Sequence, residues 1–343
     1  MGKINLKGCT LTQMEEFLKQ MDEPAYRAKQ IIKWIYKGQT EFEKMTDLPK
    51  DLIVKLKDRA YISMINIYKK HESTLDETVK YVFLLEDGNM VESVKMKYSF
   101  GNTACISSQV GCAMGCTFCA STEGGMVRNL SWGEMADEVI AIEKDSNEKV
   151  SRVVVMGSGE PLLNYDQIVQ FIKVMNSSLA FNISCRRLTV STCGIIPGII
   201  RLADEGMPIT LAVSLHAPND AIRNDLMPIN KLYPILQLLD ACKYYIIKTK
   251  RRITFEYALI SKINDSEKCA RELSNLLKDL LCHVNLIPLN PVEGKQIERS
   301  TSSQIRRFEK ILMDSGISTT IRREMGSDIE AACGQLRRSL LMR

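Results

Sequence analysis

Four of the eleven cysteines lie within fifteen residues, in the stretch 105–119. Three of them, Cys112, Cys116 and Cys119, have the spacing C-x3-C-x2-C. A short loop with this spacing can place three thiolates around one metal group, and an all-thiolate ligand set favours zinc or an iron–sulfur cluster. The stretch therefore predicts a metal site whose protein ligands come from a single loop.

The fourth ligand position decides which chemistry such a site supports. A structural zinc ion needs a fourth protein ligand, for which Cys105 is the nearest candidate. A four-iron cluster held by three cysteines instead leaves one iron open to a small molecule. The spacing alone allows both interpretations.

Size and composition limit the class of protein. A chain of 343 residues with 45% hydrophobic residues is ordinary for a soluble protein with one large and one small domain. We find no apolar run long enough to span a bilayer and no signal peptide, and therefore expect a cytoplasmic protein. An odd number of cysteines then favours metal ligands and catalytic thiols over a disulfide framework. The net charge of +5 is too small to establish a polyanionic partner.

The N-terminal part, residues 1–75, is expected to form a small helical accessory domain. Apolar residues recur at helical spacing in three segments between residues 10 and 60, the first preceded by a capping threonine. One side of the second segment is basic, with Arg27, Lys29, Lys33 and Lys37. This side could contact nucleic acid, although an ordinary solvated helix face would have the same composition.

Residues 76–97 read as a β-hairpin. Two β-rich runs flank Asp87-Gly88-Asn89, a sequence typical of a tight turn. Glu92 lies on the second strand. Without further information it would be taken as a solvent-facing strand residue.

From residue 98 to residue 343, strands and helices alternate. The predicted strands are 152–157, 187–192, 209–216, 252–260, 283–289 and 319–322. The predicted helices are 131–144, 165–176, 196–205, 235–245, 267–279 and 302–315. Repeated strand–helix units with apolar, β-branched strands predict an α/β fold with a parallel sheet, closed fully or partly into a barrel, whose reacting groups lie at the carboxyl ends of the strands.

Those predicted strand ends are polar and rich in glycine. They carry the segments 156–164 (MGSGEPLLN), 191–194 (STCG), 214–217 (SLHA) and 285–291 (NLIPLNP). Glycine lets the backbone approach a ligand closely, and a glutamate such as Glu160 can accept a hydrogen bond from an ammonium group. Four such ends around one rim would suit a nucleoside-bearing cofactor.

Taken together, the motifs resemble those of the RlmN/Cfr family of radical S-adenosylmethionine (SAM) RNA methyltransferases. The set comprises the cysteine loop, GSGEPLLN, STCG, SLHAPND, LMPIN, LIPLNP and the terminal DIEAACGQL. No single motif decides the resemblance, but the order of the set is specific and it covers nearly the whole chain. The resemblance implies a partial (β/α)6 radical SAM barrel with a small helical N-terminal domain, a [4Fe-4S] cluster and SAM.

The resemblance also implies roles for individual residues. Cluster ligation is assigned to Cys112, Cys116 and Cys119. SAM contacts are assigned to Gly159, Glu160, Ser191, Ser214, Leu215, His216 and Asn290. Cys333 is expected to become S-methylated, Cys105 to be its resolving thiol and Glu92 to be the general base. Ser158 departs from the methionine usual in the family, which puts the details of cofactor packing in doubt, and Cys193 is interpreted as a packing thiol.

The implied chemistry explains why two thiols and a base are needed. The amidine carbons of adenine are electron-poor and not nucleophilic, whereas a thiolate can take a methyl group from SAM by displacement. Reductive cleavage of a second SAM gives a 5′-deoxyadenosyl radical, which abstracts hydrogen from the S-methyl group. The resulting carbon radical adds to adenine; a base then removes the ring proton, and the second thiol releases the product by forming a disulfide with Cys333.

We therefore expect a SAM-dependent enzyme that methylates C2 of an adenine in 23S rRNA, at the peptidyl transferase centre, and also an adenine in the tRNA anticodon arm. An external electron donor such as flavodoxin or ferredoxin and a monomeric state are expected. Within the family, C8 methylation of the same rRNA adenine, as in Cfr, remains an alternative. From another class, a zinc-stabilised RNA-binding protein without catalysis is the alternative.

Overall fold

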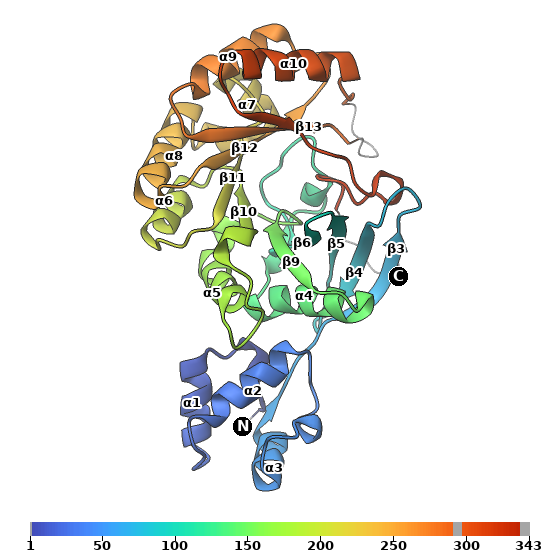
Figure 1. Ribbon diagram of the computed structural model, residues 1–343, viewed down its shortest axis with the longest axis vertical. Coiled ribbons are helices and arrows are strands. Elements are labelled where there is room, and N and C mark those ends of the chain that lie inside the picture. The colour runs from blue at the N-terminus through green and yellow to red at the C-terminus, as the bar shows by residue number, and fades with distance from the viewer. Residues whose placement is uncertain (1, 291–296, 337–343) are drawn as a thin grey trace.

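A ten-stranded sheet forms the centre of the protein in the computed structural model, which describes residues 2–290 and 297–336 (Figure 1). The strand order is β14-β13-β12-β11-β10-β9-β6-β5-β4-β3. From β6 to β14 all neighbours are parallel, and from β6 to β3 they are antiparallel. Pro291, the last residue of one strand-end motif, lies outside the described residues.

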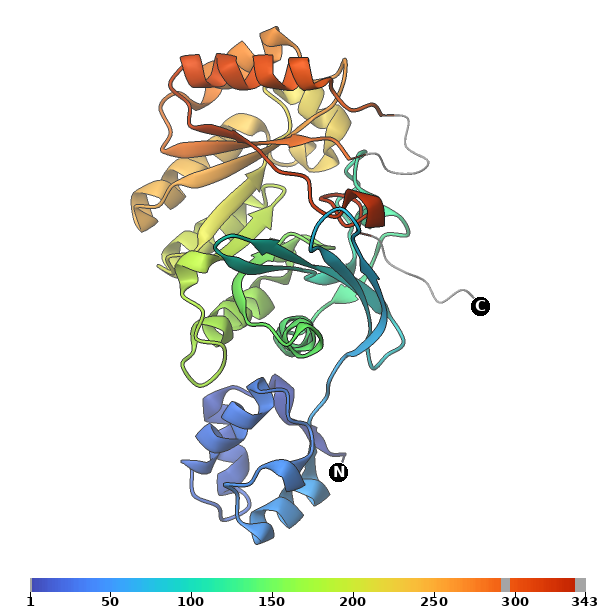
Figure 2. The same ribbon diagram turned by 45° about the vertical axis from the view of Figure 1, so that its right-hand side comes forward.

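The parallel part contains six strand–helix units followed by an edge strand, which confirms the predicted partial (β/α)6 barrel. Its strands are β6 (Gly101–Ile106), β9 (Val150–Val155), β10 (Leu188–Thr192), β11 (Thr210–Ser214), β12 (Ile253–Leu259), β13 (Cys282–Pro288) and β14 (Thr319–Ile321). Its helices are α4 (Trp132–Ser146), α5 (Tyr165–Asn176), α6 (Ile196–Asp204), α7 (Asp220–Leu226), α8 (Ile235–Thr249), α9 (Glu267–Leu277) and α10 (Ser302–Asp314). The large helices cover the outer side of the curved sheet (Figures 1 and 2).

Strand β6 was not predicted, and it changes the place of Cys105. Its first half, Gly101-Asn-Thr-Ala, has few of the β-branched or aromatic residues that favour strands. In the sheet it nevertheless lies between β5 and β9, with Cys105 paired to Val94 and Val154. Cys105 therefore belongs to the first barrel strand rather than to the cysteine loop.

The antiparallel part is formed by β3 (Asn66–Glu72), β4 (Val79–Leu84) and β5 (Met90–Tyr98). The predicted hairpin turn is present, with Gly88 at φ +81° between β4 and β5. Strand β3, which the sequence placed in the accessory domain, pairs with β4. The proposed boundary at residues 75 and 76 thus falls between two paired strands of the sheet.

The N-terminal unit is helical, as predicted, and lies beside the lower edge of the barrel (Figures 1 and 2). It contains β1 (Ile4–Asn5), α1 (Leu11–Lys19), α2 (Arg27–Tyr36), α3 (Lys50–Arg59) and β2 (Ala60–Tyr61). Lys7 ion-pairs with Asp137 of α4 at 2.6 Å, and each side chain is 1% exposed. A buried pair tolerates little displacement, since separating it would leave two uncompensated charges, so it fixes the unit against the barrel.

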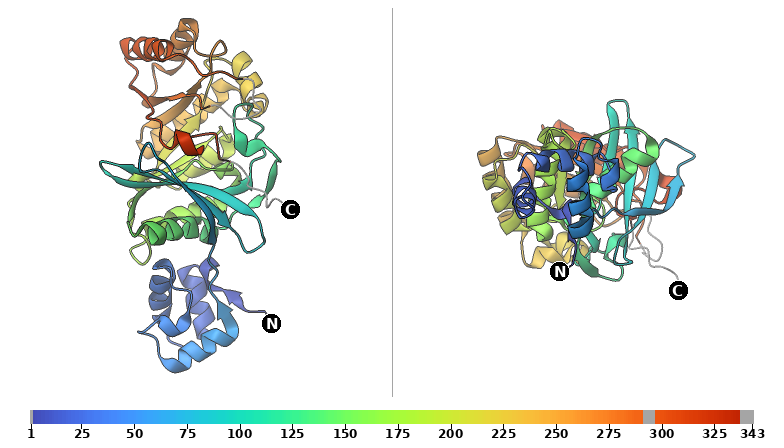
Figure 3. Two further views of the ribbon diagram at one scale, coloured as in Figure 1. Left: turned by 90° about the vertical axis from the view of Figure 1, so that its right-hand side faces the viewer. Right: turned by 90° about the horizontal axis from the view of Figure 1, so that it is seen from below.

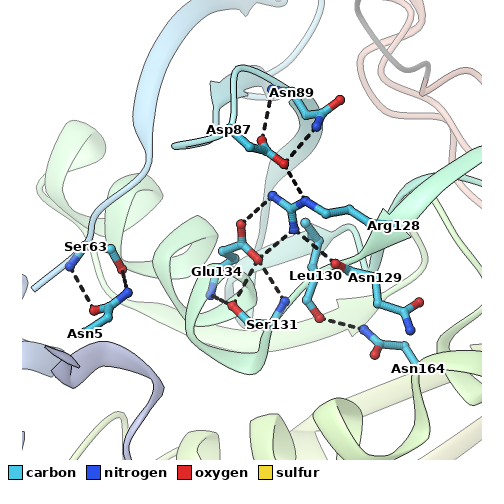
Figure 4. Close-up of polar contacts among 10 residues, drawn as sticks. All are labelled: Asn5, Ser63, Asp87, Asn89, Arg128, Asn129, Leu130, Ser131, Glu134 and Asn164. Carbon is cyan, nitrogen blue, oxygen red and sulfur yellow. Dashed lines mark hydrogen bonds and ion pairs between the residues drawn. The ribbon is translucent and has the colours of Figure 1, made fainter. Parts of the chain in front are cut away.

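Arg128 links the hairpin to the barrel (Figure 4). It lies on β8 (Met126–Asn129), which pairs with β7 (Gln109–Gly111) on either side of the cysteine loop. Its guanidinium contacts Asp87 at 2.5 Å and Glu134 of α4 at 2.8 Å. Glu134 also forms a capping box with Ser131 at the start of α4. One arginine thus ties the turn before the Glu92 strand to the segment that follows the cysteine loop.

The C-terminal segment after β14 is seated against the β3–β4 turn (Figure 3). Asp328 accepts hydrogen bonds from Ser73 Oγ at 2.7 Å and from the N–H of Thr74 at 2.8 Å. The N–H of Gly326 donates to Asp76 at 3.0 Å. These contacts position the glycine-bearing loop that carries Cys333. Among the described residues, no helix is long and apolar enough to cross a membrane.

Candidate active site

Two adjoining pockets lie at the carboxyl ends of the parallel strands. The first, here called the rim pocket, has about 970 Å³ of space when its open mouth is included. The residues predicted from the sequence that line it are Cys112, Cys116, Cys119, Gly159, Glu160, Ser191, Ser214, His216, Asn290 and Cys333. The strand ends thus converge as expected from the fold.

The second pocket, here called the thiol pocket, contains both Cys105 and Cys333. Val94 and Met96 of β5 and the segment 322–325 form other parts of its wall. Cys119, Asn290 and Cys333 line both pockets, so the two spaces meet at these residues. Cys119 and Cys333 are therefore the thiols that line both pockets, and Cys333 is the one outside the cysteine loop.

The three loop thiols fit a metal group of positive charge. Cys112 and Cys116 are buried, and burial is the main reason that the pKa of each thiol is raised, that of Cys112 to about 11. The nearby Cys119 also raises the pKa of each of these two thiols. Three neighbouring thiolates, two of them buried, repel one another, so their ionised forms need a cation among them. Cys112, Cys116 and Cys119 would hold such a group at the wall of the rim pocket.

Cys105 interacts with a different partner. Burial raises its pKa to about 12, and the next cause is Cys333 rather than any thiol of the loop. It packs in an apolar cluster with Val94 and Met96. Within the described ranges, no three His, Cys, Asp or Glu side chains, those of the cysteine loop included, are arranged to hold a single metal ion. Cys105 lies in the pocket that also contains Cys333.

The loop after β9 lets ligands approach the backbone. Gly159 has φ +110°, and a Cβ there would lie 2.7 Å from Gln109 Cβ and Ser108 Oγ. A larger residue would therefore be both strained and crowded. Ser158 is 2% exposed and does not line the rim pocket. The departure from methionine at this position thus affects packing behind the loop more than the pocket wall.

Glu160 joins two strand ends. Its carboxylate accepts hydrogen bonds from the N–H of Leu162 at 2.9 Å and of Cys193 at 2.7 Å. Burial raises the pKa of Glu160, whereas these hydrogen bonds lower it. The side chain holds the β9 loop against the end of β10 while it lines the rim pocket. Cys193 is itself 7% exposed and lines the same pocket.

His216 is held as a neutral imidazole. Its Nδ1 accepts a hydrogen bond from the N–H of Ala258 at 2.9 Å, and its ring meets Phe118 edge-on at 4.9 Å between centroids. Burial lowers its pKa to about 3. With Nδ1 used as an acceptor, the proton lies on Nε2. His216 can thus pack against a cofactor and donate one hydrogen bond.

Leu215 lies behind the rim pocket rather than in its wall. It is fully buried, and it is not among the described residues that line the pocket. Its carbonyl accepts from Arg223 Nε at 3.1 Å, and the same guanidinium binds the carbonyls of Cys193 and Ser214. Arg223 therefore clamps the ends of β10 and β11, and Leu215 is part of that scaffold.

The Cys333 loop lies directly against the cysteine loop. The N–H of Ala120 donates to Gly334 O at 2.8 Å, and Ser121 Oγ donates to Leu336 O at 2.7 Å. Asn290 Nδ2 donates to the carbonyl of Cys333 at 3.3 Å. These hydrogen bonds hold Cys333 at the junction of the two pockets.

Glu92 is buried, not solvent-facing. Glu92 is 5% exposed. Because side chains alternate between the two faces of a sheet along a strand, Glu92 lies on the same sheet face as Val94 and Met96. Its carbonyl accepts from Ser107 Oγ at 2.7 Å. Glu92 is not among the described residues that line either pocket, but it shares the sheet face of the thiol pocket.

Three charged residues of the site were missed by the sequence interpretation: Arg223, Glu256 and Arg322. Glu256 and Arg322 line the rim pocket, and Arg322 also lines the thiol pocket. The sequence positions of Glu256 and Arg322 could have indicated a place in the site, because Glu256 lies on a predicted strand and Arg322 is the last residue of another. Only the structure brings them together with Cys333.

Comparison with known proteins is consistent with this geometry. Residues 4–62 match the family described as ribosomal RNA large subunit methyltransferase N-terminal domain, and residues 106–272 match the radical SAM superfamily. Radical SAM enzymes use a [4Fe-4S] cluster and SAM, and the thiol set and the pocket described above fit both.

Whole-chain relatives are also found. The chain is 54% identical over 338 residues to a probable dual-specificity RNA methyltransferase RlmN of Thermoanaerobacter sp.. The aligned residues cover 98% of each of the two chains. It is 54% identical over 341 residues to a protein of the same description from Alkaliphilus oremlandii, and the aligned residues cover 99% of each of these two chains. A crystal structure of a radical SAM methyltransferase from Sphaerobacter thermophilus matches with a TM-score of 0.92 at 43% identity, over 97% of this chain and 99% of the other. The chain belongs to the RlmN family of radical SAM enzymes.

Proposed function

We propose that this protein methylates C2 of an adenine in 23S rRNA and an adenine in the anticodon arm of tRNA, through an S-methylated Cys333. The observation that carries the proposal is the position of Cys333 between a pocket with three loop thiols and a pocket with Cys105. The descriptions of the relatives as dual-specificity RNA methyltransferases support the choice of substrates.

In the proposed mechanism, the rim pocket binds SAM and Cys333 first takes its methyl group by displacement. The residues proposed to contact SAM are Gly159, Glu160, Ser191, Ser214, His216 and Asn290, which line the rim pocket. Leu215, which the family resemblance also assigns to SAM binding, would act indirectly, because its carbonyl binds Arg223 behind the pocket wall. Cys112, Cys116 and Cys119 would hold the cluster, which would supply the reducing electron for cleavage of a second SAM. A neutral His216 would add no positive charge to a pocket that receives a sulfonium.

The thiol pocket is proposed to complete the reaction. After the carbon of the S-methyl group has joined the adenine ring, Glu92 removes the ring proton and the adduct passes its unpaired electron to a one-electron acceptor. Cys105 then attacks the Cys333 sulfur; the S–S bond forms as the bond from that sulfur to the transferred carbon breaks, and the carbon takes up a proton to become the methyl group. Cys105 must ionise to do so, and burial opposes this because it raises the pKa of the thiol. Arg322, whose charge lowers the same pKa, would favour the attack.

The RNA must present its adenine unstacked, because C2 is not accessible to this pocket inside a helix. We assign phosphate contacts to α2, where Lys29, Lys33 and Lys37 are exposed and follow each other at intervals of one helical turn. Lys37 lies 5.2 Å from the centre of the Trp34 ring, so the row combines cations with an aromatic side chain. An external electron donor such as flavodoxin or ferredoxin and a monomeric, cytoplasmic enzyme complete the proposal.

The position of methylation tests the proposed function. Nucleosides from 23S rRNA of cells with and without the gene should differ by 2-methyladenosine, which is identified by liquid chromatography and mass spectrometry against synthetic 2-methyl and 8-methyl standards. The tRNA fraction should gain the same nucleoside. A product that is only 8-methyladenosine would show Cfr-type chemistry and overturn the proposal.

Replacement of Cys105 tests the role of the second thiol. The Cys105→Ala enzyme should accumulate a covalent protein–RNA adduct, visible as a shifted band that ribonuclease removes, because no thiol can attack Cys333. Cys185→Ala is the control, since Cys185 is a partly exposed thiol that lines neither pocket. Normal turnover without adduct in the Cys105 variant would exclude the resolving role.

Charge reversal on α2 tests the RNA surface. With Lys29, Lys33 and Lys37 all changed to Glu, the slope of log affinity against log salt should fall by roughly 1 for each lysine that contacts a phosphate. Reversal of Lys268, Lys278 and Lys310, which are exposed on or beside α9 and α10, is the matched control. Equal affinities and slopes for wild type and the α2 variant would remove α2 from the interface.

A further inference from the structure

Arg322 is the cation nearest to the Cys333 sulfur among the contacts of the described residues. Its Nη1 lies 3.5 Å from Cys333 Sγ. It follows β14 directly, and its N–H donates to Leu286 O at 2.8 Å, which anchors the backbone to β13. The side chain is 22% exposed and lines both pockets. A rigid strand end thus aims a guanidinium at the sulfur that faces both spaces.

Glu256 of β12 lies near the same guanidinium nitrogen. Its Oε2 lies 4.0 Å from Arg322 Nη1 and accepts a hydrogen bond from Asn285 Nδ2 at 2.9 Å. Burial raises the pKa of Glu256, and Arg322 acts against this. Cys105 of β6 and Tyr98 of β5 are the other titratable groups whose charge acts on Arg322. Of the groups that raise the pKa of Arg322, Cys333 has the largest effect, in keeping with its short distance from Nη1.

We propose that Arg322 is a catalytic residue, the counter-ion of the Cys333 thiolate that accepts the methyl group, and that Glu256 is a positioning residue that holds Arg322 in place. The inference rests on the proposed function, in which Cys333 is the methyl acceptor. A guanidinium is permanently charged and donates directional hydrogen bonds, so it both favours the thiolate and fixes its direction.

The pairing also depends on the state of the sulfur. The thiolate attacks the methyl carbon of SAM; the new S–C bond forms as the bond from methyl to the sulfonium breaks, and its electron pair neutralises the departing S-adenosylhomocysteine. No oxidant or reductant takes part. The product at Cys333 is a neutral thioether, so Arg322 loses this anionic partner while its contact with Glu256 remains. The contact therefore weakens when the methyl group has been loaded.

Methyl loading measured without any reductant tests the proposal. Holoenzyme whose Cys333 peptide has the mass of the free thiol is mixed with SAM carrying a deuterated methyl group, and the labelled peptide is followed by mass spectrometry. Arg322→Gln should slow loading by about 10- to 100-fold, the size expected when an adjacent opposite charge that favours a thiolate is removed. Arg322→Lys, which keeps the charge, should restore a large part of the rate. Glu256→Gln should give a smaller loss.

Alkylation by iodoacetamide gives a second readout in the same samples. Cys333 should react more slowly in Arg322→Gln than in wild type, while the partly exposed Cys185 should react equally in both and so report an intact fold. Equal loading and alkylation rates for wild type and Arg322→Gln, or no rescue by Arg322→Lys, would overturn the inference. Absence of methyl loading in wild type, with Cys333 alkylation still dependent on Arg322, would instead refute the proposed function and leave the ion pair supported.

Discussion

The pairing of β6 between β5 and β9 is the constraint on which the site depends. It places Cys105 on a barrel strand, opposite Val94 and Val154, and therefore outside the loop that carries the other three thiols. Had residue 105 remained in the loop, a fourth thiolate would have been available to the metal group and would have closed its coordination. The sheet register thus separates the three loop thiols, which we propose to bind the metal group, from the thiol that we propose to react with Cys333.

The second requirement is that a distant segment reaches this place. The chain after β14 crosses to the β3–β4 turn, where Asp328 and Gly326 are hydrogen-bonded, and then returns to the cysteine loop through Gly334. Each contact joins segments that are far apart in the sequence. Cys333 consequently faces the rim pocket on one side and the thiol pocket on the other. In the proposed mechanism, Cys333 first receives a methyl group and later meets a second thiol, and both steps need this position.

The sequence predicted the parts of the site with local signatures. The cysteine spacing, the glycine-bearing strand ends and the alternation of strands and helices all depend on residues close together in the chain, and the fold that they predict is the one observed. Strand β6 was missed because its residues have weak strand preference. The association of Arg322 with Glu256 and Cys333 could not be predicted, since it depends on parallel register and on a crossing segment. Burial of Glu92 likewise follows from neighbouring strands rather than from its own sequence context.

The central claim is that three cysteines bind the metal group and Cys105 does not. Metal analysis of anaerobically purified protein tests it most directly. Wild type and Cys105→Ala should both contain about four iron atoms per chain and no stoichiometric zinc, whereas Cys116→Ala should lose the iron. A colourless wild-type protein with one zinc, lost when Cys105 is replaced, would contradict the account.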